Sequence, residues 1–509
     1  MPQKGTKSII IEKLPRLKLL PKGKFRIDGL GLAEVQIAHN SRVFCRLHRL
    51  ILSKILLISS LSYGIVIPIM NVLIQSLRMK TPIALVGMGV SGEATLRLLL
   101  DCGFDRQQIL TFDGKSPADF SSPEALAKAK PKTLCVSPGI SLETPWIKDL
   151  LQEDILLTSE LEIAFSFLTS ELVISVTGSI GKSTTTSLIG VGARAIDPTA
   201  FVGGNLGFPL ADYSRQLINN GVKAKYVILE LSSYQLESFK NLRTDVSVFT
   251  FLSPNHLERY RGLEHYYQTK LSLISKTKRA VVINSHGGDL LQKSKPYQGQ
   301  HADLKWIFAH RQDPRFTEWM IRAPALVGIH NLDNLAMAFS VSDFFCWPME
   351  CRDAMLSFPG LPHRLENCGV RHGILFLNDS KSTTMDSVLH AVKSVLPDLK
   401  SSGRLYLLLG GRDKNLPWSD LSVLSAENSI VFSFFGEIGE SARKQSELEG
   451  ITYPTLQNCL SSISSQLREN DILLLSPGGT SWDEFKNFED RGQFFKNWIL
   501  SKFYNDQAR

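Results

Sequence analysis

The chain has 509 residues, which is too long for one hydrophobic core and suggests about three domains. Its hydrophobic content of 43% and charged content of 21% are ordinary for a soluble globular protein. The net charge of +8 would favour a nucleic acid or anionic lipid as partner, but residues 1–78 hold thirteen Lys and Arg against three acidic residues. The remaining 431 residues therefore sum to −2, and we expect no nucleic-acid partner. Seven scattered cysteines without a C-x-x-C pair indicate reduced thiols, as in a cytoplasmic protein, and not a zinc site or a disulfide framework.

Residues 1–78 form a basic N-terminal extension that includes an apolar segment. Ile55–Ile74 is a run of twenty uncharged residues, long enough as a helix to cross ~30 Å of hydrocarbon. Two interpretations remain open. The segment is a membrane anchor flanked by basic residues, or it is not part of the working protein and translation starts at Met79. We favour the second, so membrane contact is expected only if residues 1–78 belong to the protein; mass spectrometry of the native N-terminus distinguishes the two.

From residue 79 onward, apolar β-branched runs alternate with helical patterns, which is typical of βαβ units on parallel sheets. The predicted fold class is α/β, with three consecutive domains at 79–170, 171–360 and 361–509. Eleven strands are predicted, at residues 83–86, 109–112, 133–136, 172–176, 226–229, 246–251, 280–283, 375–378, 405–409, 430–434 and 472–475.

A glycine-rich loop, Thr177-Gly-Ser-Ile-Gly-Lys-Ser-Thr184, follows the predicted strand at 172–176 and precedes an apolar helical stretch. Glycines let backbone N–H groups point at phosphate oxygens, and the helix N-terminus adds a positive dipole. Lys182 can reach the β- and γ-phosphates, and Ser183 can ligate Mg²⁺. The loop is shorter than the common G-x-x-x-x-G-K-S/T form, because Val176 stands where that pattern has its first glycine. The context still predicts nucleotide binding.

A second glycine pattern, Gly87-Met-Gly-Val-Ser-Gly92, follows the predicted strand at 83–86, and Asp113 lies further along the chain. By itself this pattern would suggest a dinucleotide site. A lone G-x-G-x-x-G is a weak signal, and the phosphate loop outweighs it.

Further motifs follow in order and extend the evidence beyond the loop. They are Gly203-Gly-Asn-Leu-Gly207, Glu230-Leu-Ser-Ser-Tyr-Gln-Leu-Glu237, Ser253-Pro-Asn-His-Leu-Glu-Arg-Tyr260, Tyr267-Gln-Thr-Lys270, His330-Asn-Leu-Asp-Asn334, Leu361-Pro-His-Arg-Leu-Glu366, Asn378-Asp-Ser-Lys-Ser-Thr383, Gly410-Gly-Arg-Asp-Lys414 and Ser476-Pro-Gly-Gly-Thr-Ser-Trp-Asp-Glu-Phe-Lys-Asn-Phe-Glu-Asp-Arg-Gly492. This ordered set, over residues 80–500, resembles the Mur ligases of peptidoglycan assembly. Within that family it is most similar to members that add D-glutamate to UDP-N-acetylmuramoyl-L-alanine.

The resemblance implies a Rossmann-like UDP-binding domain, a P-loop ATPase central domain and a Rossmann-like C-terminal domain that binds the amino acid. It also implies a monomeric cytoplasmic enzyme that uses ATP and Mg²⁺, and an acyl-phosphate intermediate that the D-glutamate nitrogen attacks. Activation of a carboxylate needs cations and metals around the phosphoryl group and does not need a protein nucleophile.

By the same resemblance, the ATP site is expected to contain residues from the central and third domains. The expected ATP contacts are Gly178, Ser179, Gly181, Lys182, Ser183, Thr184, Asn331, Asn334, Arg364, Asp379 and Lys381. The expected metal ligands are Ser183, Glu230, His256 and Lys270, the last as a carbamylated lysine. Catalysis is assigned to Lys182, Glu230, His256, Lys270 and Lys414.

The two other substrates have their own expected sites. The UDP-substrate contacts are Gly87, Gly89, Val90, Asp113, Lys115, Gly139 and Asn205. The D-glutamate contacts are Thr383, Lys414, Ser481 and Phe488.

One position departs from the family pattern, which usually reads Gly-Thr-Asn-Gly-Lys in the phosphate loop. Here Ser179 and Ile180 replace Thr and Asn, and Ile180 removes a polar side chain beside the phosphates. We expect altered ATP affinity without loss of activity. Two alternatives stay open: another Mur ligase specificity, such as L-alanine addition, or a membrane-tethered nucleotide-binding protein without turnover.

Overall fold

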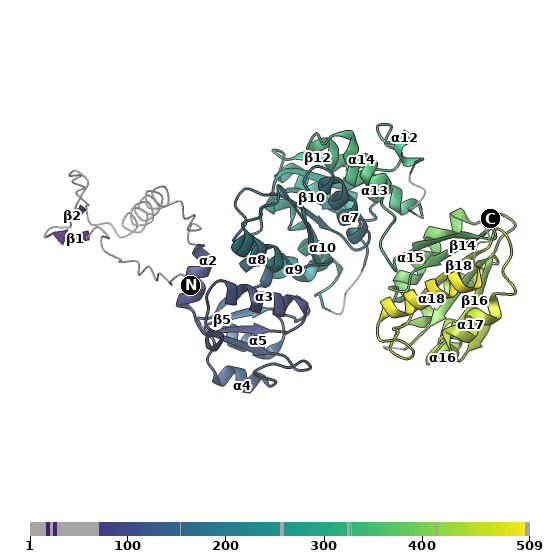
Figure 1. Ribbon diagram of the computed structural model, residues 1–509, viewed down its shortest axis with the longest axis horizontal. Helices are drawn as coiled ribbons and strands as arrows, with labels where there is room; N and C mark the ends of the chain where they lie inside the picture. Colours follow the sequence, from purple (N-terminus) through teal and green to yellow (C-terminus); the bar gives the residue numbers. More distant parts are fainter. Residues whose placement is uncertain are drawn as a thin grey trace, which may run out of the picture. The chain divides into compact units, whose positions relative to one another are not determined.

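The computed structural model describes residues 17–20, 24–27, 71–152, 154–254, 259–322, 326, 328–412 and 416–503. The chain divides into two units, Met1–Asn71 and Val72–Arg509 (Figure 1). In the first unit, β1 (Leu17–Leu20) pairs antiparallel with β2 (Lys24–Ile27), where no strand was predicted. Most of the apolar run at 55–74 lies outside the described residues. Among the residues that are described, no helix is both long enough and apolar enough to cross a membrane.

The first domain of the second unit has a four-stranded parallel sheet in the order β4-β3-β5-β6. On β3, Ile83 and Leu85 enter one hydrophobic cluster, and Ala84 and Val86 enter another, so both faces of the sheet are covered. The strands are β3 (Ile83–Val86), β4 (Ile109–Phe112), β5 (Thr133–Val136) and β6 (Leu156–Thr158), and the helices are α2 (Val72–Met79), α3 (Val90–Asp101), η1 (Arg106–Gln108), α4 (Pro123–Lys128), α5 (Pro145–Leu151) and α6 (Glu160–Phe165).

Helix α2 extends this domain upstream of the boundary expected at residue 79. Leu77 is fully buried and Ile74 is 9% exposed, and both pack in the same cluster as Ile83 and Leu85. Residues 72–78 therefore contribute apolar surface to the folded first domain.

The central domain has a six-stranded parallel sheet in the order β12-β11-β10-β7-β9-β8. Strand β7 lies between β10 and β9, so the loop that follows β7 has polar loops from both neighbours beside it. The strands are β7 (Leu172–Thr177), β8 (Phe201–Gly204), β9 (Tyr226–Glu230), β10 (Thr244–Phe249), β11 (Thr277–Asn284) and β12 (Lys305–Ala309). The helices are α7 (Lys182–Arg194), α8 (Leu210–Asn220), α9 (Ser233–Ser238), α10 (Leu263–Leu271), η2 (Ile274–Lys276), α11 (Leu290–Gln300), α12 (Thr317–Met320), α13 (Ile329–Phe344) and α14 (Met349–Leu356).

The third domain has a six-stranded sheet in the order β13-β14-β18-β15-β16-β17, in which only β13 runs antiparallel to its neighbour. The strands are β13 (Glu366–Arg371), β14 (Ile374–Asn378), β15 (Leu405–Gly410), β16 (Ile430–Phe435), β17 (Gly450–Tyr453) and β18 (Ile472–Gly478). The helices are α15 (Met385–Val395), η3 (Leu396–Asp398), η4 (Trp418–Ala426), α16 (Gly439–Ser446), α17 (Leu456–Ile463) and α18 (Phe488–Lys502).

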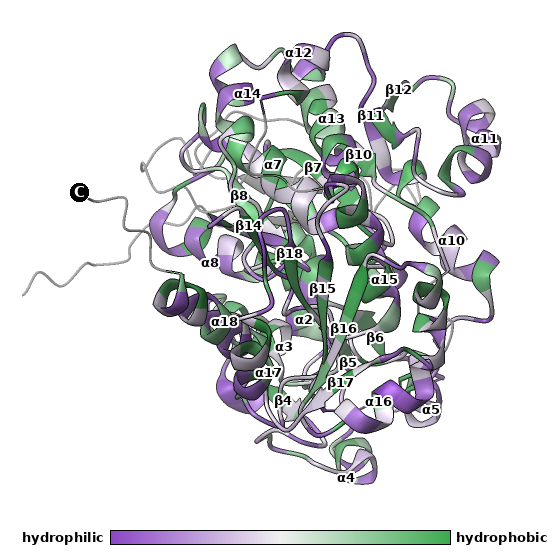
Figure 2. Cartoon of the chain, turned by 90° about the vertical axis from the view of Figure 1, so that its right-hand side faces the viewer, coloured by the Kyte–Doolittle hydropathy of each residue, from purple (hydrophilic) through white to green (hydrophobic). Residues whose placement is uncertain are grey.

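Alternation along β15 shows how this sheet is sandwiched between helices. Leu405, Leu407 and Leu409 pack in the cluster that includes α15, whereas Tyr406 and Leu408 pack in the cluster that includes α17 and α18. Figure 2 shows β15, β16 and β18 as hydrophobic ribbons, and the helices beside them carry both hydrophilic and hydrophobic residues. The observed class is thus α/β with three largely parallel sheets, as predicted.

Candidate active site

A polar cavity of about 650 Å³ lies at the loop after β7. Its lining combines the central domain with the turn before β13, the loop after β14 and helix α15 of the third domain. Twelve of the expected residues line it: Ser179, Gly181, Lys182, Ser183, Thr184, Asn205, Glu230, Asn331, Asn334, Arg364, Asp379 and Lys381. The cavity therefore collects most of the expected ATP site, and it adds Asn205, which was expected on the UDP-substrate side.

The backbone of the phosphate loop needs its two glycines. Gly178 has φ of 150° and Gly181 has φ of 83°, values that L side chains rarely adopt. A Cβ at Gly178 would lie 2.1 Å from Thr250 Oγ1, and one at Gly181 would lie 2.6 Å from Asn334 Oδ1. Thr250 Oγ1 also donates to the Ile180 carbonyl at 2.5 Å, so the loop after β10 holds the phosphate loop from one side.

Charged groups are buried directly beside this loop. Glu230 is 1% exposed and Lys270 is 2% exposed, and Lys270 Nζ donates to the Gly178 carbonyl at 2.8 Å. Burial lowers the pKa of Lys182, while Glu230 acts in the opposite sense. Burial, and then the charge of Lys182, hold the pKa of Lys270 well below its ordinary value. The charges of Lys182 and Lys270 oppose each other, which favours an anion at this loop.

Glu230 uses one of its two oxygens within the described part of the chain. Its Oε1 accepts from Asn205 Nδ2 at 2.6 Å, whereas Oε2 is buried and has no hydrogen-bond partner among the described residues. A buried carboxylate oxygen without a partner is costly, so it fits a cation ligand beside Ser183, which lines the same cavity.

Ser179 links the phosphate loop to its surroundings. Its hydroxyl lies 3.0 Å from Tyr266 OH, accepts from Ser253 N at 3.1 Å and donates to the Ser253 carbonyl at 3.0 Å. The side chain of Ser179 thus points into the protein, and the neighbouring Ile180 lines the cavity. Ser179 was predicted as an ATP contact. Its hydroxyl hydrogen-bonds to residues of the protein interior, and its backbone N–H donates to the Phe251 carbonyl at 2.7 Å.

The two asparagines at the start of α13 form a chain that reaches the phosphate loop. Asn334 Nδ2 donates to Asn331 Oδ1 at 2.9 Å, and Asn334 Oδ1 accepts from Thr185 Oγ1 at 3.1 Å. Both asparagines are less than 9% exposed. These bonds fix the amide orientation at the cavity wall.

The third domain contributes Arg364, Asp379 and Lys381 to the cavity. Asp379 accepts from Leu365 N at 3.1 Å and from Ser476 Oγ at 2.8 Å. Burial raises the pKa of Asp379 to about 7, and the Ser476 hydrogen bond opposes that rise. Lys381 Nζ lies 4.9 Å from the centre of the Phe488 ring, and burial lowers the pKa of Lys381.

The three expected D-glutamate residues that the structure describes do not line this cavity. Ser481 is buried after β18, Phe488 begins α18, and Thr383 is half-buried in the loop after β14. The remaining D-glutamate residue, Lys414, and the expected metal ligand His256 lie outside the described residues.

The expected UDP-substrate residues gather, except for Asn205, at the carboxyl edge of the first sheet. Gly87 follows β3 with φ of 93°, Asp113 follows β4, and Gly139 lies in the loop after β5. The Asp113 carboxylate accepts three hydrogen bonds from backbone N–H groups, from Met88 N and Lys115 N at 2.8 Å and from Ser116 N at 2.9 Å. These bonds, Ser116 first, hold the pKa of Asp113 below its ordinary value. Asp113 thus ties the Gly87–Gly92 loop to the Lys115 loop, and Gly89, Val90 and Lys115 lie in those two loops.

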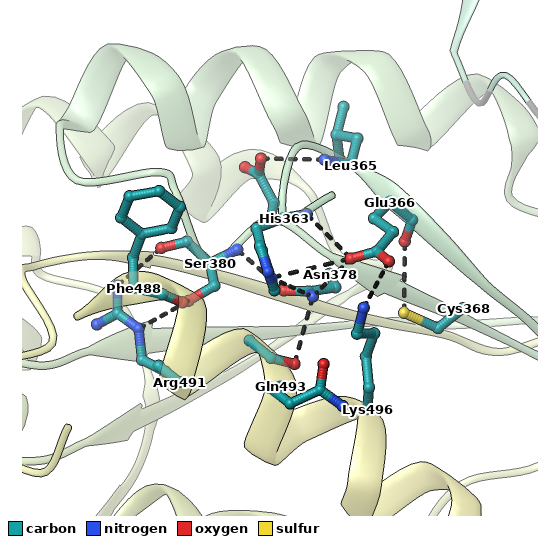
Figure 3. A network of polar contacts seen from close by, with 12 residues as sticks. His363, Leu365, Glu366, Cys368, Asn378, Ser380, Phe488, Arg491, Gln493 and Lys496 are labelled. Atoms are coloured by element: carbon teal, nitrogen blue, oxygen red, sulfur yellow. Dashed lines mark hydrogen bonds and ion pairs between the residues drawn. The ribbon is translucent and has the colours of Figure 1, made fainter. Parts of the chain in front are cut away.

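Two arginines at these sites were not predicted. Arg491 on α18 is fully buried; it donates to the Ser380 carbonyl at 2.9 Å, to Ser380 Oγ at 3.0 Å and to the Gly479 carbonyl at 3.1 Å (Figure 3). Burial lowers its pKa to about 10. Arg259 donates to the Pro138 carbonyl and to Glu237 at 2.8 and 2.9 Å, which connects the loop after β5 to the central domain. Both residues lie inside the quoted motifs, but a motif does not show which of its cations are buried.

A phosphate-binding type of loop that opens α7, with the half-buried Lys182 and the buried Lys270 and Glu230 beside it, defines a nucleotide-binding α/β protein. The sequence profile of the Mur ligase middle domain matches residues 176–342. A protein of Vibrio cholerae named UDP-N-acetylmuramoylalanine--D-glutamate ligase is 34% identical over 374 residues, which cover 70% of this chain and 81% of that protein. A protein of the same name from Buchnera aphidicola is 30% identical, over 81% of this chain and 96% of that protein.

Among solved structures, the MurF ligase from Thermotoga maritima in complex with ADP covers 77% of this chain and 94% of its own, with a TM-score of 0.51 and 13% identity. That likeness concerns the fold. The sequence relatives show that the chain belongs to the Mur ligase family. The relatives most similar in sequence are named as its D-glutamate ligases.

Proposed function

We propose that the protein is an ATP-dependent ligase that joins D-glutamate to the carboxylate of UDP-N-acetylmuramoyl-L-alanine. The observation that carries the proposal is the cavity itself. It combines the phosphate loop and the buried Glu230 with Arg364 and Lys381 of the third domain. Relatives of this chain are named UDP-N-acetylmuramoylalanine--D-glutamate ligase, which is the activity proposed here.

Mg²⁺ fits the residues present. The Oε2 of Glu230, which no described residue hydrogen-bonds, and the hydroxyl of Ser183 are oxygen ligands of the kind that Mg²⁺ prefers, and they would hold it together with the phosphates. When bound, the ion would neutralise charge on the phosphate oxygens. His256 is proposed as a further ligand from its motif, since it lies outside the described residues.

The reaction we propose has two steps. The substrate carboxylate attacks the γ-phosphorus of ATP, forming an acyl phosphate and releasing ADP. The D-glutamate nitrogen then attacks the acyl carbon, phosphate leaves, and the nitrogen loses a proton. Lys182 and Arg364 provide positive charge where phosphoryl oxygens become more negative.

Lys270 is proposed to act after carbamylation. An amine must be neutral to react with carbon dioxide, and burial lowers the pKa of Lys270 well below its ordinary value. The product is a carboxylate on a helix directly beside the phosphate loop, and its charge would oppose that of Lys182.

The remaining residues are proposed to hold the other two substrates. The loops after β3, β4 and β5, with Asp113 and Lys115, would bind the UDP part. Ser481, Phe488, Thr383 and Lys414 would bind D-glutamate, and closure of the third domain on the central domain would complete the site. The protein is proposed to work as a cytoplasmic monomer, which size-exclusion chromatography with light scattering and cell fractionation would test.

Release of inorganic phosphate tests the function. The purified protein should release phosphate only when ATP, Mg²⁺, UDP-N-acetylmuramoyl-L-alanine and D-glutamate are all present, and the product mass should increase by one glutamyl residue. Activity with L-alanine on UDP-N-acetylmuramate would overturn the proposed specificity. Nucleotide binding without any turnover would overturn the proposed enzyme.

A further inference from the structure

Arg364 enters the cavity from a turn with an uncommon backbone. The residues on both sides of it, His363 and Leu365, have φ of 60° and 43°, although neither is glycine. Side chains with a Cβ rarely adopt this left-handed region, and such residues persist only where the surroundings hold them. The direction of the Arg364 side chain therefore depends on the contacts that stabilise this turn.

Two carboxylates provide those contacts. Glu366 Oε2 accepts from His363 N at 2.9 Å, and Asp379 Oδ1 accepts from Leu365 N at 3.1 Å. Lys381 N closes the turn by donating to the His363 carbonyl at 3.1 Å. The N–H groups before and after Arg364 are thus each held by a side-chain carboxyl oxygen, and the hydrogen bond to the ionised Glu366 is stronger than a neutral one.

Glu366 is itself held from two further elements. Asn378 Nδ2, at the end of β14, donates to Glu366 Oε2 at 2.9 Å, and Lys496 Nζ, on α18, donates to Oε1 at 2.8 Å. The Glu366 and Lys496 side chains are 18% and 26% exposed, so solvent screens the pair only in part. Figure 3 shows His363, Glu366, Asn378 and Lys496 pointing toward one another. Burial opposes ionisation of Glu366, but Lys496 and the His363 N–H hold its pKa below the ordinary value.

Helix α18 is shaped to accept the turn. A Cβ at Gly492 would lie 2.1 Å from His363 Nδ1, so only glycine leaves room for the imidazole there. His363 Nδ1 lies 3.0 Å from Asn378 Nδ2, which places the ring between β14 and α18. The turn is therefore fixed on its inner side by packing and on its two N–H groups by carboxylates.

We propose that Glu366, held by Lys496, is a positioning residue that fixes the His363–Leu365 turn and so keeps the Arg364 guanidinium in the nucleotide cavity. This inference rests on the proposed function only in placing triphosphate in that cavity. Glu366 does not line the cavity, so it acts through Arg364 and not on the nucleotide.

A double-mutant cycle on nucleotide binding tests the proposal. Wild type, Glu366→Gln, Arg364→Ala and the double variant are titrated with β,γ-imido-ATP and Mg²⁺ by calorimetry. Glutamine keeps the shape of Glu366 but puts an NH₂ group against either Lys496 or the donors of the turn. Misplacement of a positioned group by about 1 Å costs up to about 100-fold, so we expect about tenfold weaker binding for Glu366→Gln.

The double variant should bind no more weakly than Arg364→Ala alone, because Glu366 acts through Arg364. Lys496→Met provides a second variant that leaves the turn acceptor in place; we expect about threefold weaker binding, again hidden by Arg364→Ala. Glu440→Gln is the matched control, since Glu440 is half exposed on α16 and pairs with Arg443 outside the cavity. Thermal unfolding should show all variants folded at the titration temperature.

Binding losses that add in the double variant would overturn the proposal, as would Glu366→Gln and Lys496→Met both binding within twofold of wild type. The cycle needs no turnover. A wild-type protein that binds the analogue but does not use D-glutamate would overturn the proposed function alone.

Discussion

Two glycine-rich loops follow the first strand of a parallel sheet in this chain, and both open a helix. The Gly87–Gly92 loop joins β3 to α3, and the Gly178–Ser183 loop joins β7 to α7. Both use positive-φ glycines, at Gly87 and at Gly178 and Gly181. They differ in the charges beside them: Lys270 and Glu230 are buried and Lys182 is half-buried at the second, whereas the acid of the first, Asp113, is bound by backbone N–H groups.

The difference shows that glycine spacing provides a concave backbone without determining what binds there. Two lysines and a carboxylate oxygen that no described residue hydrogen-bonds suit phosphates that carry a metal and undergo transfer. A loop whose acid is satisfied by its own backbone suits a ligand that is held and not transformed. Of the four predictions below, the first and the last test this distinction, and the other two test the packing of the domain that contains the first loop.

Removal of the central cation should have the largest effect. Lys182→Ala should lower kcat by about 1,000-fold or more, because a positive charge at the phosphates would be lost from the transition state. Lys115→Ala, at the other loop, should raise the KM for the UDP substrate about tenfold and leave kcat nearly unchanged. Steady-state phosphate release measures both. Equal loss of kcat in the two variants would remove the proposed distinction between the loops.

Loss of α2 should destabilise the first loop's domain. A chain that begins at residue 79 lacks the buried Leu77 and Ile74, and it should be less stable than one that begins at residue 72 by about 3 kcal/mol. Urea unfolding of the two truncated proteins provides the measurement. Equal midpoints would show that α2 contributes nothing to this core.

The contact between the first domain and the central domain should depend on pH. Glu160 on α6 accepts from Ala211 N at 2.6 Å, and burial raises its pKa from 4.5 to about 7. Because the folded pKa is raised, its contribution to stability is complete below pH 4.5 and is lost as pH rises through 7. Between pH 5 and pH 8 wild type should lose about 2 kcal/mol from this group, and Glu160→Gln should lack that loss. Parallel melting curves for the two proteins across this range would contradict the prediction.

Paired glycine substitutions should have the smallest effects, and each should change the KM of a different substrate. Gly181→Ala should raise the KM for ATP about tenfold, because the new Cβ would meet Asn334 and the left-handed backbone disfavours alanine. Gly87→Ala should instead raise the KM for the UDP substrate, since its Cβ would lie 2.9 Å from Ile140 and Ser137. If each variant raises both KM values equally, the loops do not serve separate substrates.

The sequence by itself determined the interior of this fold. All ten strands with neighbours on both sides in the second unit were predicted, because burial on both faces makes them continuous apolar runs. The five strands missed there, β6, β8, β12, β13 and β17, are all edge strands, whose exposed side lets polar residues and glycines interrupt the run. The motifs likewise predicted twelve residues of the cavity lining, because chemistry requires particular side chains at fixed spacing.

Only the tertiary structure decided which polar groups are buried and what they contact. Asn205 stays a predicted contact of the UDP substrate, and only the structure shows that its Nδ2 donates to Glu230 Oε1. Arg491 and Arg259 look like surface cations in sequence, yet each is enclosed by carbonyls from distant segments. The sequence assigned no role to Glu366 within its motif. Its proposed role depends on contacts with β14 and α18, which meet at one turn. Burial and long-range hydrogen bonds depend on how separate segments pack, and no local pattern encodes that packing.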